Sequence, residues 1–542
     1  MLKLLSDESK FWIELLAKLG LTKAKLKAVL AEINQQVSSP SFPESVSPYS
    51  KQVRFPFHGK YLSVTPVASH QMQTELERLA SKEGDKPQLT NIELPYPASI
   101  GNLCGSLGGH MRMIFSPIGA KHGQTLAKSR LKTRKFFDNY QLNNKRAMEV
   151  LRRLAGQAPQ ITKQRQQRAR VHQVAILRKQ IALWLLPLIE LKEKHTLGEL
   201  MNFGGDDELV RRFVLCELDQ LPELAKGITH RVHYVLQEDR FTRNLAYHPK
   251  LIQPVRTQVE WVLKQLAIGD EQEQAFSGEQ YLYLSGLRAE DAQAQSSPYV
   301  AGVPSLTGIW GFVHRYQLNA VDLLDDDIDV DFASFAIFIR NERIFHSAKL
   351  SEFNDTVAKR QISAAKRPTT KTNLYADLEF DLVIKVRTDH SLRDFEKQLK
   401  AALPSSFCGG VVFPPRIQDS TSPWALVMDS KSSLFFKLKG LSSSGAWLVP
   451  SKVNDASLGE IVSATIDDQS NVAISNGFRL LEQPRAREGT VSSMHAYAEN
   501  IVSIGKAINP IEYRLTGCNS FFSSAFWTLN VENETILIQK DE

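Results

Sequence analysis

The chain has 542 residues, of which 42% are hydrophobic and 23% are charged, and it carries a net charge of +7. These values are ordinary for a soluble globular protein of about two to four domains. The longest apolar run, residues 181–191, is too short to cross a bilayer, and the acidic N-terminal stretch lacks the cleavage site of a signal peptide, so we expect a cytoplasmic protein. The four cysteines are far apart, which predicts neither a zinc site nor a disulfide framework.

The first region, residues 1–120, is predicted to mix helices and strands. Residues 1–35 have apolar residues close to a 3.6-residue period, which predicts two short helices, and a Ser/Pro-rich loop follows at 38–50. KYLSVTPVASHQMQTELERLA then predicts a strand, a turn and a helix. Near the end of the region, SLGGHMRM predicts a tight turn that would project Arg112 into a DNA groove, and a plain surface loop is the alternative.

Residues 121–275 are predicted to form a helical bundle with a basic surface. From Lys121 to Gln180 there are sixteen Lys or Arg residues and two acids, a local charge of +14, so the rest of the chain sums to −7. Apolar residues recur at helical spacing in RVHQVAILRKQIALWLLPLIELKEK. The opposite face carries Arg165, Arg168, Arg178 and Lys179. A solvated helical face is the alternative, but the length and spacing of the basic run favour contact with nucleic acid.

Residues 276–542 are predicted to interleave strands with helices, so the chain as a whole is assigned to the α+β class. Five stretches are predicted strands: YLYLSGL, SFAIFIRNERIF, LYADLEFDLVIKV, CGGVVFPPRI and SLFFKLKGL. VSSMHAYAENIVSIGKAI is predicted to be the last helix, and FFSSAFWTLNVENETILIQK is predicted to close the chain as strands.

The stretch SSPYVAGVPSLTGIWGFVHR leads through two prolines and three glycines into a short amphipathic helix. Ser305 can cap this helix, since its side chain precedes the first helical turn. Its buried face is predicted to consist of Leu306, Ile309, Trp310 and Val313. Gly308 and Gly311 lie off that face, and each costs about 1 kcal/mol relative to alanine.

A phosphate ligand would explain the cost of these glycines. Free amides at a helix N-terminus favour phosphate, and glycine lets a ligand approach the backbone closely. His314 and Arg315 could then reach the same ligand. A packing helix that tolerates glycine is the alternative.

Three further stretches contain residue types found in binding sites. SAAKRPTTKTN is a predicted β-hairpin that would point Lys366, Arg367 and Lys371 at a nucleic-acid backbone, or an ordinary exposed hairpin. CGG at 408–410, with Arg416, is a weaker glycine-plus-arginine turn. The acidic run DLLDDDIDVD lacks the spacing of a calcium loop and predicts a solvated edge, so no metal is expected.

Motifs for catalysis are missing from the sequence. It contains no G-x-S-x-G, no H-E-x-x-H and no Walker lysine. Asp389 and His390 are neighbours at a predicted strand end, where adjacent side chains point to opposite sides. We therefore expect a protein that is not an enzyme and needs no cofactor.

Several motifs resemble known CRISPR families. VPSLTGIWGFVHR, CGGVVFPPRI, GAWLVPS, GFRLLEQP and FWTLN resemble the subunit that binds the crRNA 5′ handle in type I-F complexes, the Cas-five or Csy-two family. Upstream, YLSVTPVASHQMQ and SIGNLCGSLGGHMR resemble the large subunit, the Cas-eight or Csy-one family. The two resemblances follow each other in one chain, which is similar to the fused subunit of transposon-encoded type I-F Cascade.

This resemblance implies a fold and a separate role for each region of the chain. Residues 276–542 would form a ferredoxin/RRM-like domain with a hairpin thumb that binds the 5′ handle. The implied contacts are Ser305, Thr307, Gly308, His314 and Arg315, with the KRPTTK hairpin added. Residues 1–120 would recognise the protospacer-adjacent motif through Arg112, with Asn102, Gly109 and His110 in support. The bundle at 121–275 would contact displaced DNA or neighbouring subunits.

The hypothesis is therefore a subunit of a type I-F RNA-guided DNA-targeting complex, of the transposon-associated kind. Its expected partners are crRNA, target double-stranded DNA, Cas-seven-like backbone subunits, a Cas-six-like subunit and a TniQ-type transposition protein. Three alternatives stay open: a defence complex that recruits a helicase-nuclease, an RNA-processing ribonuclease that uses His314 or His495, and a scaffold whose bundle binds only proteins.

Overall fold

The structure is a computed structural model. It describes residues 18, 20, 42–46, 52–83, 89–93, 110–118, 136–138, 141–157, 163–196, 207–267, 279–325, 328–346, 374–416, 423–441, 445–451, 457–468 and 470–541. The chain divides into two compact units, Met1–Val67 with Arg479–Glu499, and Ala68–Phe478 with Asn500–Glu542. Within the described part, no helix combines the length and the apolar character that a membrane crossing requires.

The first unit contains a small group of paired strands. β1 (Val53–Phe57) and β2 (Lys60–Val67) form a hairpin, and residues 494–499 of β14 (Met494–Ile508) pair with β2 in parallel. The hairpin turn at His58 and Gly59 has φ angles of 46° and 74°, as two-residue hairpin turns require.

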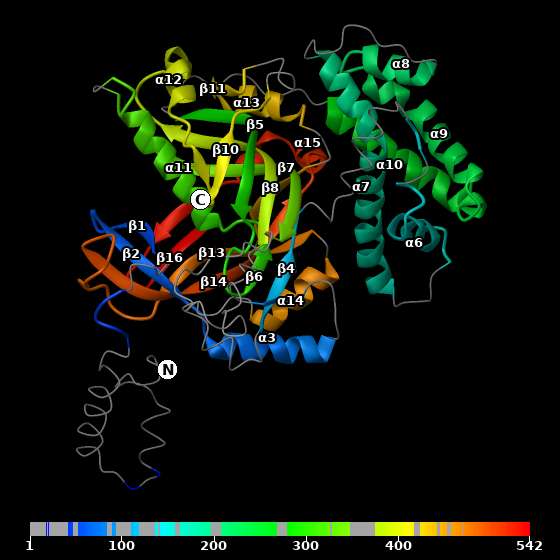
Figure 1. The fold of residues 1–542 in the computed structure, drawn as a ribbon. Coiled ribbons are helices and arrows are strands. Elements are labelled where there is room, and N and C mark those ends of the chain that lie inside the picture. The colour runs from blue at the N-terminus through cyan, green and yellow to red at the C-terminus, as the bar shows by residue number, and fades with distance from the viewer. Residues whose placement is uncertain are drawn as a thin grey trace, which may run out of the picture. The chain divides into compact units, whose positions relative to one another are not determined.

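The second unit is built around a β-α-β-β-α-β module. Its elements in chain order are β5 (Glu279–Gln293), α11 (Leu306–Val321), β7 (Asp331–His346), β8 (Leu374–Arg387), α12 (Glu396–Ala401) and β10 (Gly410–Phe413). The strands lie in the order β7-β8-β5-β10, and all neighbours are antiparallel (Figure 1). This is the arrangement of a ferredoxin-like fold, which agrees with the α+β class expected from the sequence.

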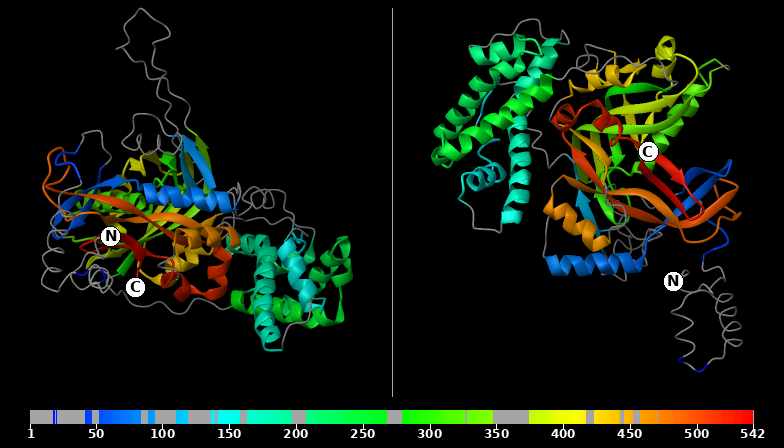
Figure 2. Two further views of the ribbon diagram at one scale, coloured as in Figure 1. Left: turned by 90° about the horizontal axis from the view of Figure 1, so that it is seen from below. Right: turned by 180° about the vertical axis from the view of Figure 1, so that it is seen from behind.

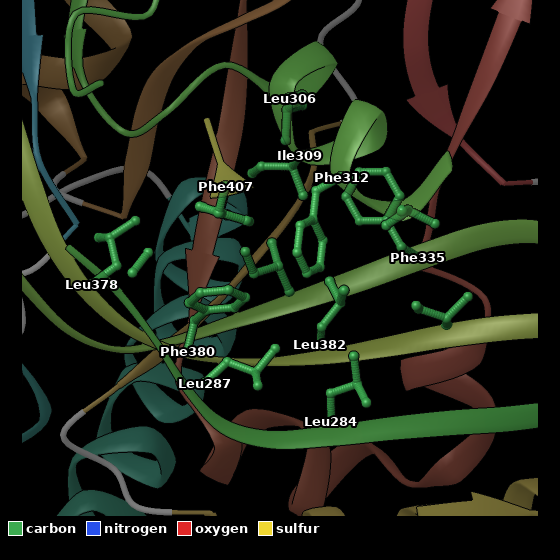
Figure 3. Packing of buried hydrophobic residues seen from close by; sticks show 14 of the residues in the cluster. Leu284, Leu287, Leu306, Ile309, Phe312, Phe335, Leu378, Phe380, Leu382 and Phe407 are labelled. Atoms are coloured by element: carbon green, nitrogen blue, oxygen red, sulfur yellow. The ribbon is translucent and has the colours of Figure 1, made fainter. Parts of the chain in front are cut away.

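The core of this module lies between α11 and the sheet. Alternate residues of β5 and β8, such as Leu284 and Leu382, face the helix because strand side chains alternate between the two sides. Leu306, Ile309 and Phe312 meet them from α11 (Figure 3). The shorter elements around the module are β6 (Val300–Gly302), η6 (Arg393–Phe395), β9 (Ser406–Phe407) and β11 (Ala425–Met428).

The sheet continues beyond β7, which also pairs with β15 (Trp527–Val531). The next strands are β16 (Thr535–Lys540) and β13 (Asn471–Leu480), while β12 (Ala446–Pro450) pairs with β7 and with residues 505–508 of β14. An aromatic core that includes Trp447 and Phe521 covers this side. It is closed by α13 (Lys431–Leu438) and α16 (Cys518–Phe522).

Part of the N-terminal sequence packs into the second unit. β3 (Leu89–Glu93), β4 (His110–Ser116) and β6 form a three-stranded sheet. α3 (His70–Glu83) and α14 (Leu458–Asp467) share a core with it that includes Leu76, Ile114 and Ile461.

The predicted bundle is mostly helical in its described residues. Its elements are α6 (Lys145–Leu154), α7 (Lys163–Thr196), α8 (Glu208–Leu215), η3 (Leu221–Leu224), α9 (Ala225–Glu238), η4 (Arg243–Leu245) and α10 (Pro249–Ala267) (Figure 2). α15 (Pro510–Thr516) joins the bundle core through Ile511 and Leu515, while its Tyr513 belongs to the aromatic core. This short helix therefore ties the bundle to the sheet.

The sequence predicted several elements correctly and mistook others. The strands β5, β7, β8 and β10 and the helix α11 are confirmed. SLFFKLKGL was expected to be a strand, but its core is the helix α13, capped by Ser430. VSSMHAYAENIVSIGKAI was expected to be a helix, but it contains the strand β14. The closing stretch begins with the short helix α16 before its two strands.

Candidate nucleic-acid interface

The N-terminus of α11 is organised by Ser305. Its hydroxyl oxygen accepts a hydrogen bond from the Gly308 amide at 3.2 Å, as expected for the cap. The Thr307 hydroxyl donates to the same oxygen at 3.4 Å, and its side chain is buried. Both residues, which were expected to bind the crRNA handle, thus have structural contacts inside the protein.

The two glycines of α11 differ in what surrounds them. A Cβ atom at Gly308 would lie 3.0 Å from the Cys408 sulfur and 3.0 Å from the Ser305 hydroxyl. A Cβ atom at Gly311 would meet nothing within 4 Å. The close approach at Gly308 therefore comes from the β9–β10 turn, whereas Gly311 faces open space and leaves the backbone accessible.

The β9–β10 turn is the CGG stretch. Cys408 and Gly409 both have positive φ angles, 48° and 85°. A Cβ atom at Gly410 would lie 2.3 Å from the Glu290 carbonyl oxygen of the neighbouring strand, so a larger residue there would push the strands apart. These glycines fix the turn that packs against the start of α11.

His314 and Arg315 lie one turn further along α11. The His314 ring stacks on Trp310, with ring centres 4.9 Å apart and planes 9° apart. Arg315 is exposed and belongs to the same surface stripe as Gly311, four residues earlier. Beside this half-buried aromatic pair, α11 thus presents an exposed cation at Arg315 and, at Gly311, backbone that no side chain covers.

The structure places Arg112 in strand β4, not in a turn, which corrects the expectation from SLGGHMRM. β4 pairs with β3 on one side and β6 on the other, so the glycines precede a regular strand. The Arg112 guanidinium lies 3.3 Å from the Glu77 carboxylate of α3, and its side chain is 14% exposed. Any DNA contact by Arg112 must therefore compete with Glu77.

The remaining residues expected to contact DNA or the crRNA 5′ handle are only partly described by the structure. His110 begins β4, and its side chain is outside the described part. Asn102, Gly109, Lys366, Arg367 and Lys371 also lie outside the described residues. The KRPTTK stretch falls between β7 and β8. Phe345, near the end of β7, and Tyr375, near the start of β8, stack with ring centres 6.3 Å apart.

The basic residues expected on the bundle surface contact other residues of the chain where their side chains are described. The Arg178 guanidinium lies 3.7 Å from the centre of the Trp261 ring and donates to the Gln258 side chain at 2.9 Å. Lys179 forms an ion pair of 2.7 Å with Glu512 on α15. Arg165 and Arg168 lie on α7, but their side chains are outside the described part.

His495, considered as a ribonuclease residue, is completely buried. Its Nδ1 lies 3.0 Å from the Arg487 guanidinium, which can only donate, so Nε2 carries the proton and donates to the Thr65 hydroxyl at 2.8 Å. Burial and the Arg487 charge lower the pKa of His495 to about 4. This geometry gives His495 a structural role and no access to an RNA substrate.

Sequence reasoning did not single out the stretch of the bundle between α9 and α10. Exposed rings and cations alternate there along the chain, as in Tyr234, Arg240, Phe241, Arg243 and Tyr247. The available signal was this alternation of aromatic and basic residues, which the denser charge at 121–180 overshadowed. Among the described residues, no group of His, Cys, Asp and Glu is placed to hold a metal ion.

Comparison with known families gives one match. Residues 282–432 match the family model of the CRISPR-associated protein Cas_Csy2. Curated proteins give no match to the chain. The matched segment begins in β5 and ends in α13, so it covers the ferredoxin-like module with its helix α11 and its β9–β10 turn. In this segment the chain is similar to Cas_Csy2, which supports a CRISPR-associated subunit of the type I-F Cascade kind.

Proposed function

We propose that the chain is a subunit of a type I-F RNA-guided DNA-targeting complex, in which the module around α11 binds the 5′ handle of crRNA. The observation that carries this proposal is the position of the Cas_Csy2 match, which falls on the ferredoxin-like module and includes the whole of α11. A single-stranded handle can lay its bases on aromatic rings and its phosphates on cations and amides. The exposed side of α11 offers a ring at His314, a cation at Arg315 and, at Gly311, a surface that no side chain covers.

The second part of the proposal concerns DNA. Arg112 reads the protospacer-adjacent motif in the duplex, and it leaves Glu77 when it does so. A guanidinium suits this role because it can donate two parallel hydrogen bonds to a guanine. The guide then supplies the remaining sequence specificity by base pairing. We infer from the order of the two resemblances in one chain that the complex is of the transposon-associated kind, and a neighbouring helicase-nuclease gene in place of transposase genes would contradict this.

Copurification tests the handle-binding role. The chain is expressed with Cas-seven-like and Cas-six-like subunits and a CRISPR array, and the bound RNA is sequenced. RNA of uniform length that begins with the repeat-derived handle is expected, and a complex free of RNA would contradict the proposal. Uncleaved precursor should stay intact when incubated with this chain alone, whereas a ribonuclease would cut it.

Substitutions on α11 locate the handle. Gly311→Leu fills open space without touching the core, so it should fold normally and retain about tenfold less crRNA if the handle approaches the helix there, as for a loss of about 1.4 kcal/mol. Gly308→Leu is unsuitable because it strikes Cys408. Arg315→Ala should act in the same direction, and Lys397→Ala on exposed α12 is the matched control. Equal crRNA retention in all three variants would remove α11 from the binding site.

Binding of target DNA tests Arg112. Arg112→Ala should abolish the preference for one adjacent motif while the complex still assembles. Glu77→Gln frees the guanidinium from its carboxylate partner, so it should preserve that preference. An unchanged motif preference in Arg112→Ala would contradict the assignment.

A further inference from the structure

A pocket lies beside α8, apart from the residues assigned to handle binding and motif recognition. Its volume is about 670 Å³, a size typical of small-molecule sites. α8, η3 and the turn between them line it, and Cys216 forms part of its wall. We call it the α8 pocket and define it by this thiol and four charged residues: Glu208, Arg211, Arg212 and Glu223. The fold thus brings a nucleophilic side chain together with charged groups that could orient a ligand.

The Cys216 thiol lies next to a buried cation. Cys216 is half-buried at the end of α8, and its Sγ donates to the Phe213 carbonyl at 3.3 Å. The ammonium group of Lys192, a buried residue of α7, lies 3.8 Å from the same sulfur. A cation at this distance stabilises the negative charge that sulfur carries when it attacks an electrophile. Burial of the lysine strengthens this effect, since little water screens its charge.

The ammonium group is also fixed in place. It donates to the backbone carbonyls of Phe213 and Val214, both at 3.3 Å, and to that of Cys216. These bonds hold the cation beside the sulfur before any reagent arrives, so it need not rearrange during the reaction. The site is therefore preorganised for attack by the Cys216 sulfur.

Two arginines at the pocket favour a reagent that carries carboxylates. Arg211 and Arg212 are exposed and form no ion pair with any residue that the structure describes. Arg212 lies four residues before the thiol and so on the same side of α8. With Lys192 there are three cations near the thiol, against the two carboxylates of Glu208 and Glu223, so the surroundings attract a negative charge. The two carboxylates can in turn hold an amino group of the same reagent.

The other described thiols serve as a comparison. Cys408 lies against Gly308 at the start of α11, and Cys518 packs against the aromatic core. Both are half-buried, as Cys216 is, but neither lines the α8 pocket. Differences in reactivity among the three thiols therefore report their surroundings rather than their exposure.

We propose that Cys216 is a thiol modification site, at which a small peptide disulfide with carboxylate groups binds in the α8 pocket and forms a mixed disulfide. The Cys216 thiolate attacks one sulfur of the reagent, the sulfur–sulfur bond of the reagent breaks, and its other half leaves as a thiolate that takes up the proton released by Cys216. One disulfide is lost and one is formed, so no further oxidant is required. The carboxylates lie on Arg211 and Arg212, and the amino group lies near Glu208 or Glu223. The proposal goes beyond the proposed function, since it involves neither guide nor target DNA.

Peptide mass spectrometry of the purified full chain tests the site. The chain is incubated with glutathione disulfide at low salt, the remaining thiols are alkylated at fixed times, and the adduct is measured at each cysteine. Cys216 should be modified at least about tenfold faster than Cys408 or Cys518, the size of effect expected when a site concentrates a charged reagent. A reducing dithiol should remove the adduct.

Reagents of different charge test the role of the arginines. Arg211→Gln combined with Arg212→Gln should slow modification by glutathione disulfide at least about fivefold at low salt, and high salt should reduce that difference. Hydroxyethyl disulfide, which is uncharged, should modify Cys216 equally fast with and without the arginines. Arg240→Gln, exposed and outside the pocket, is the matched control and should react as the unaltered chain does. The three arginines are exposed, so thermal unfolding should not change.

Three results would overturn the proposal. The first is an equal rate of modification of Cys216, Cys408 and Cys518 by glutathione disulfide. The second is an equal rate at Cys216 in the unaltered chain and in the arginine double variant. The third is the same slowing of that variant with hydroxyethyl disulfide, which would trace the effect to the fold rather than to charge. Handle binding by α11 and motif recognition by Arg112 play no part in these measurements, so the proposals can fail separately.

Discussion

Two groups of cations in the bundle differ in how their charges are used. On α7, Arg178 lies over Trp261 and Lys179 pairs with Glu512, so their charges stabilise contacts between helices. Beyond the end of α9, Arg240 and Arg243 are exposed and form no ion pair with any described residue; Arg240 lies 6.0 Å from the centre of the Phe241 ring, and Nε of Arg243 donates to the Gln237 carbonyl at 3.3 Å. The density of Lys and Arg in a sequence therefore shows where charge is, and only the fold shows which charge is left for a ligand.

The largest effect is expected at Lys192, the most deeply buried cation of α7 for which the structure shows the surroundings. Its ammonium group donates to the backbone carbonyls of Phe213 and Val214, both at 3.3 Å, and to that of Cys216, and so satisfies the end of α8. Lys192→Met should lower the free energy of unfolding by about 3–4 kcal/mol, since these carbonyls lose a charged donor. Urea unfolding measures the change.

The matched control is Lys226→Met on α9. Lys226 is exposed and forms no ion pair with a described residue, so its loss should change stability by less than about 0.5 kcal/mol. Similar effects of the two substitutions would break the distinction between inward and outward cations.

The same distinction separates two histidines, and it predicts a dependence on pH. His314 is half-buried on α11, whereas His495 is completely buried beside Arg487, with Glu482 next to that arginine. The pKa of His495 is about 4 in the folded chain and near 6.5 when unfolded. Between these values the unfolded chain binds more protons, so this histidine favours unfolding as pH falls from 6.5 toward 4.

This contribution should reach about 3 kcal/mol at pH 4 and vanish above pH 6.5. His495→Gln, which cannot take up a proton, should lower stability at pH 7 by losing packing, but its stability should fall less steeply with acid. Urea unfolding between pH 4 and 7.5 gives both curves. Parallel curves for the variant and the unaltered chain would show that His495 does not titrate in this range.

Local sequence patterns predicted those elements whose signals, such as a helix cap and an apolar period, lie within the element itself. α11 has its cap at Ser305 and its apolar period within one stretch, and both appear in the structure. β14 was mistaken for a helix because its Ala, Met and Glu residues favour helices locally, whereas its pairing partner β2 lies more than 400 residues earlier. α13 was mistaken for a strand because of its two phenylalanines, although Ser430 offered a cap.

The candidate site was predictable to a smaller extent. The sequence located α11 and its basic end, but the partner that requires Gly308 to be small is Cys408, 100 residues later. The Gly-Gly pair before Arg112 suggested a turn, and the pairing of β4 with β3 and β6 makes that arginine part of a sheet. Contacts between distant segments decide which polar groups remain free, and no local pattern records them.

The smallest changes in stability are expected from substitutions at two neighbouring residues of α7, Arg178 and Lys179. Arg178→Gln removes a guanidinium that stacks on Trp261 and bonds to Gln258, so it should cost about 1–2 kcal/mol of stability, and Arg178→Lys should restore little because an ammonium lacks the planar stacking surface. Lys179→Gln should cost less than about 1 kcal/mol, since its ion pair with Glu512 is 41% exposed on the lysine side and is screened by water. Urea unfolding at low and high salt distinguishes the two substitutions, because high salt should reduce the loss of stability only for Lys179→Gln. If both substitutions leave stability unchanged but weaken binding of nucleic acid, the cations of α7 are available to ligands after all, and the contrast with the exposed Arg240 and Arg243 disappears.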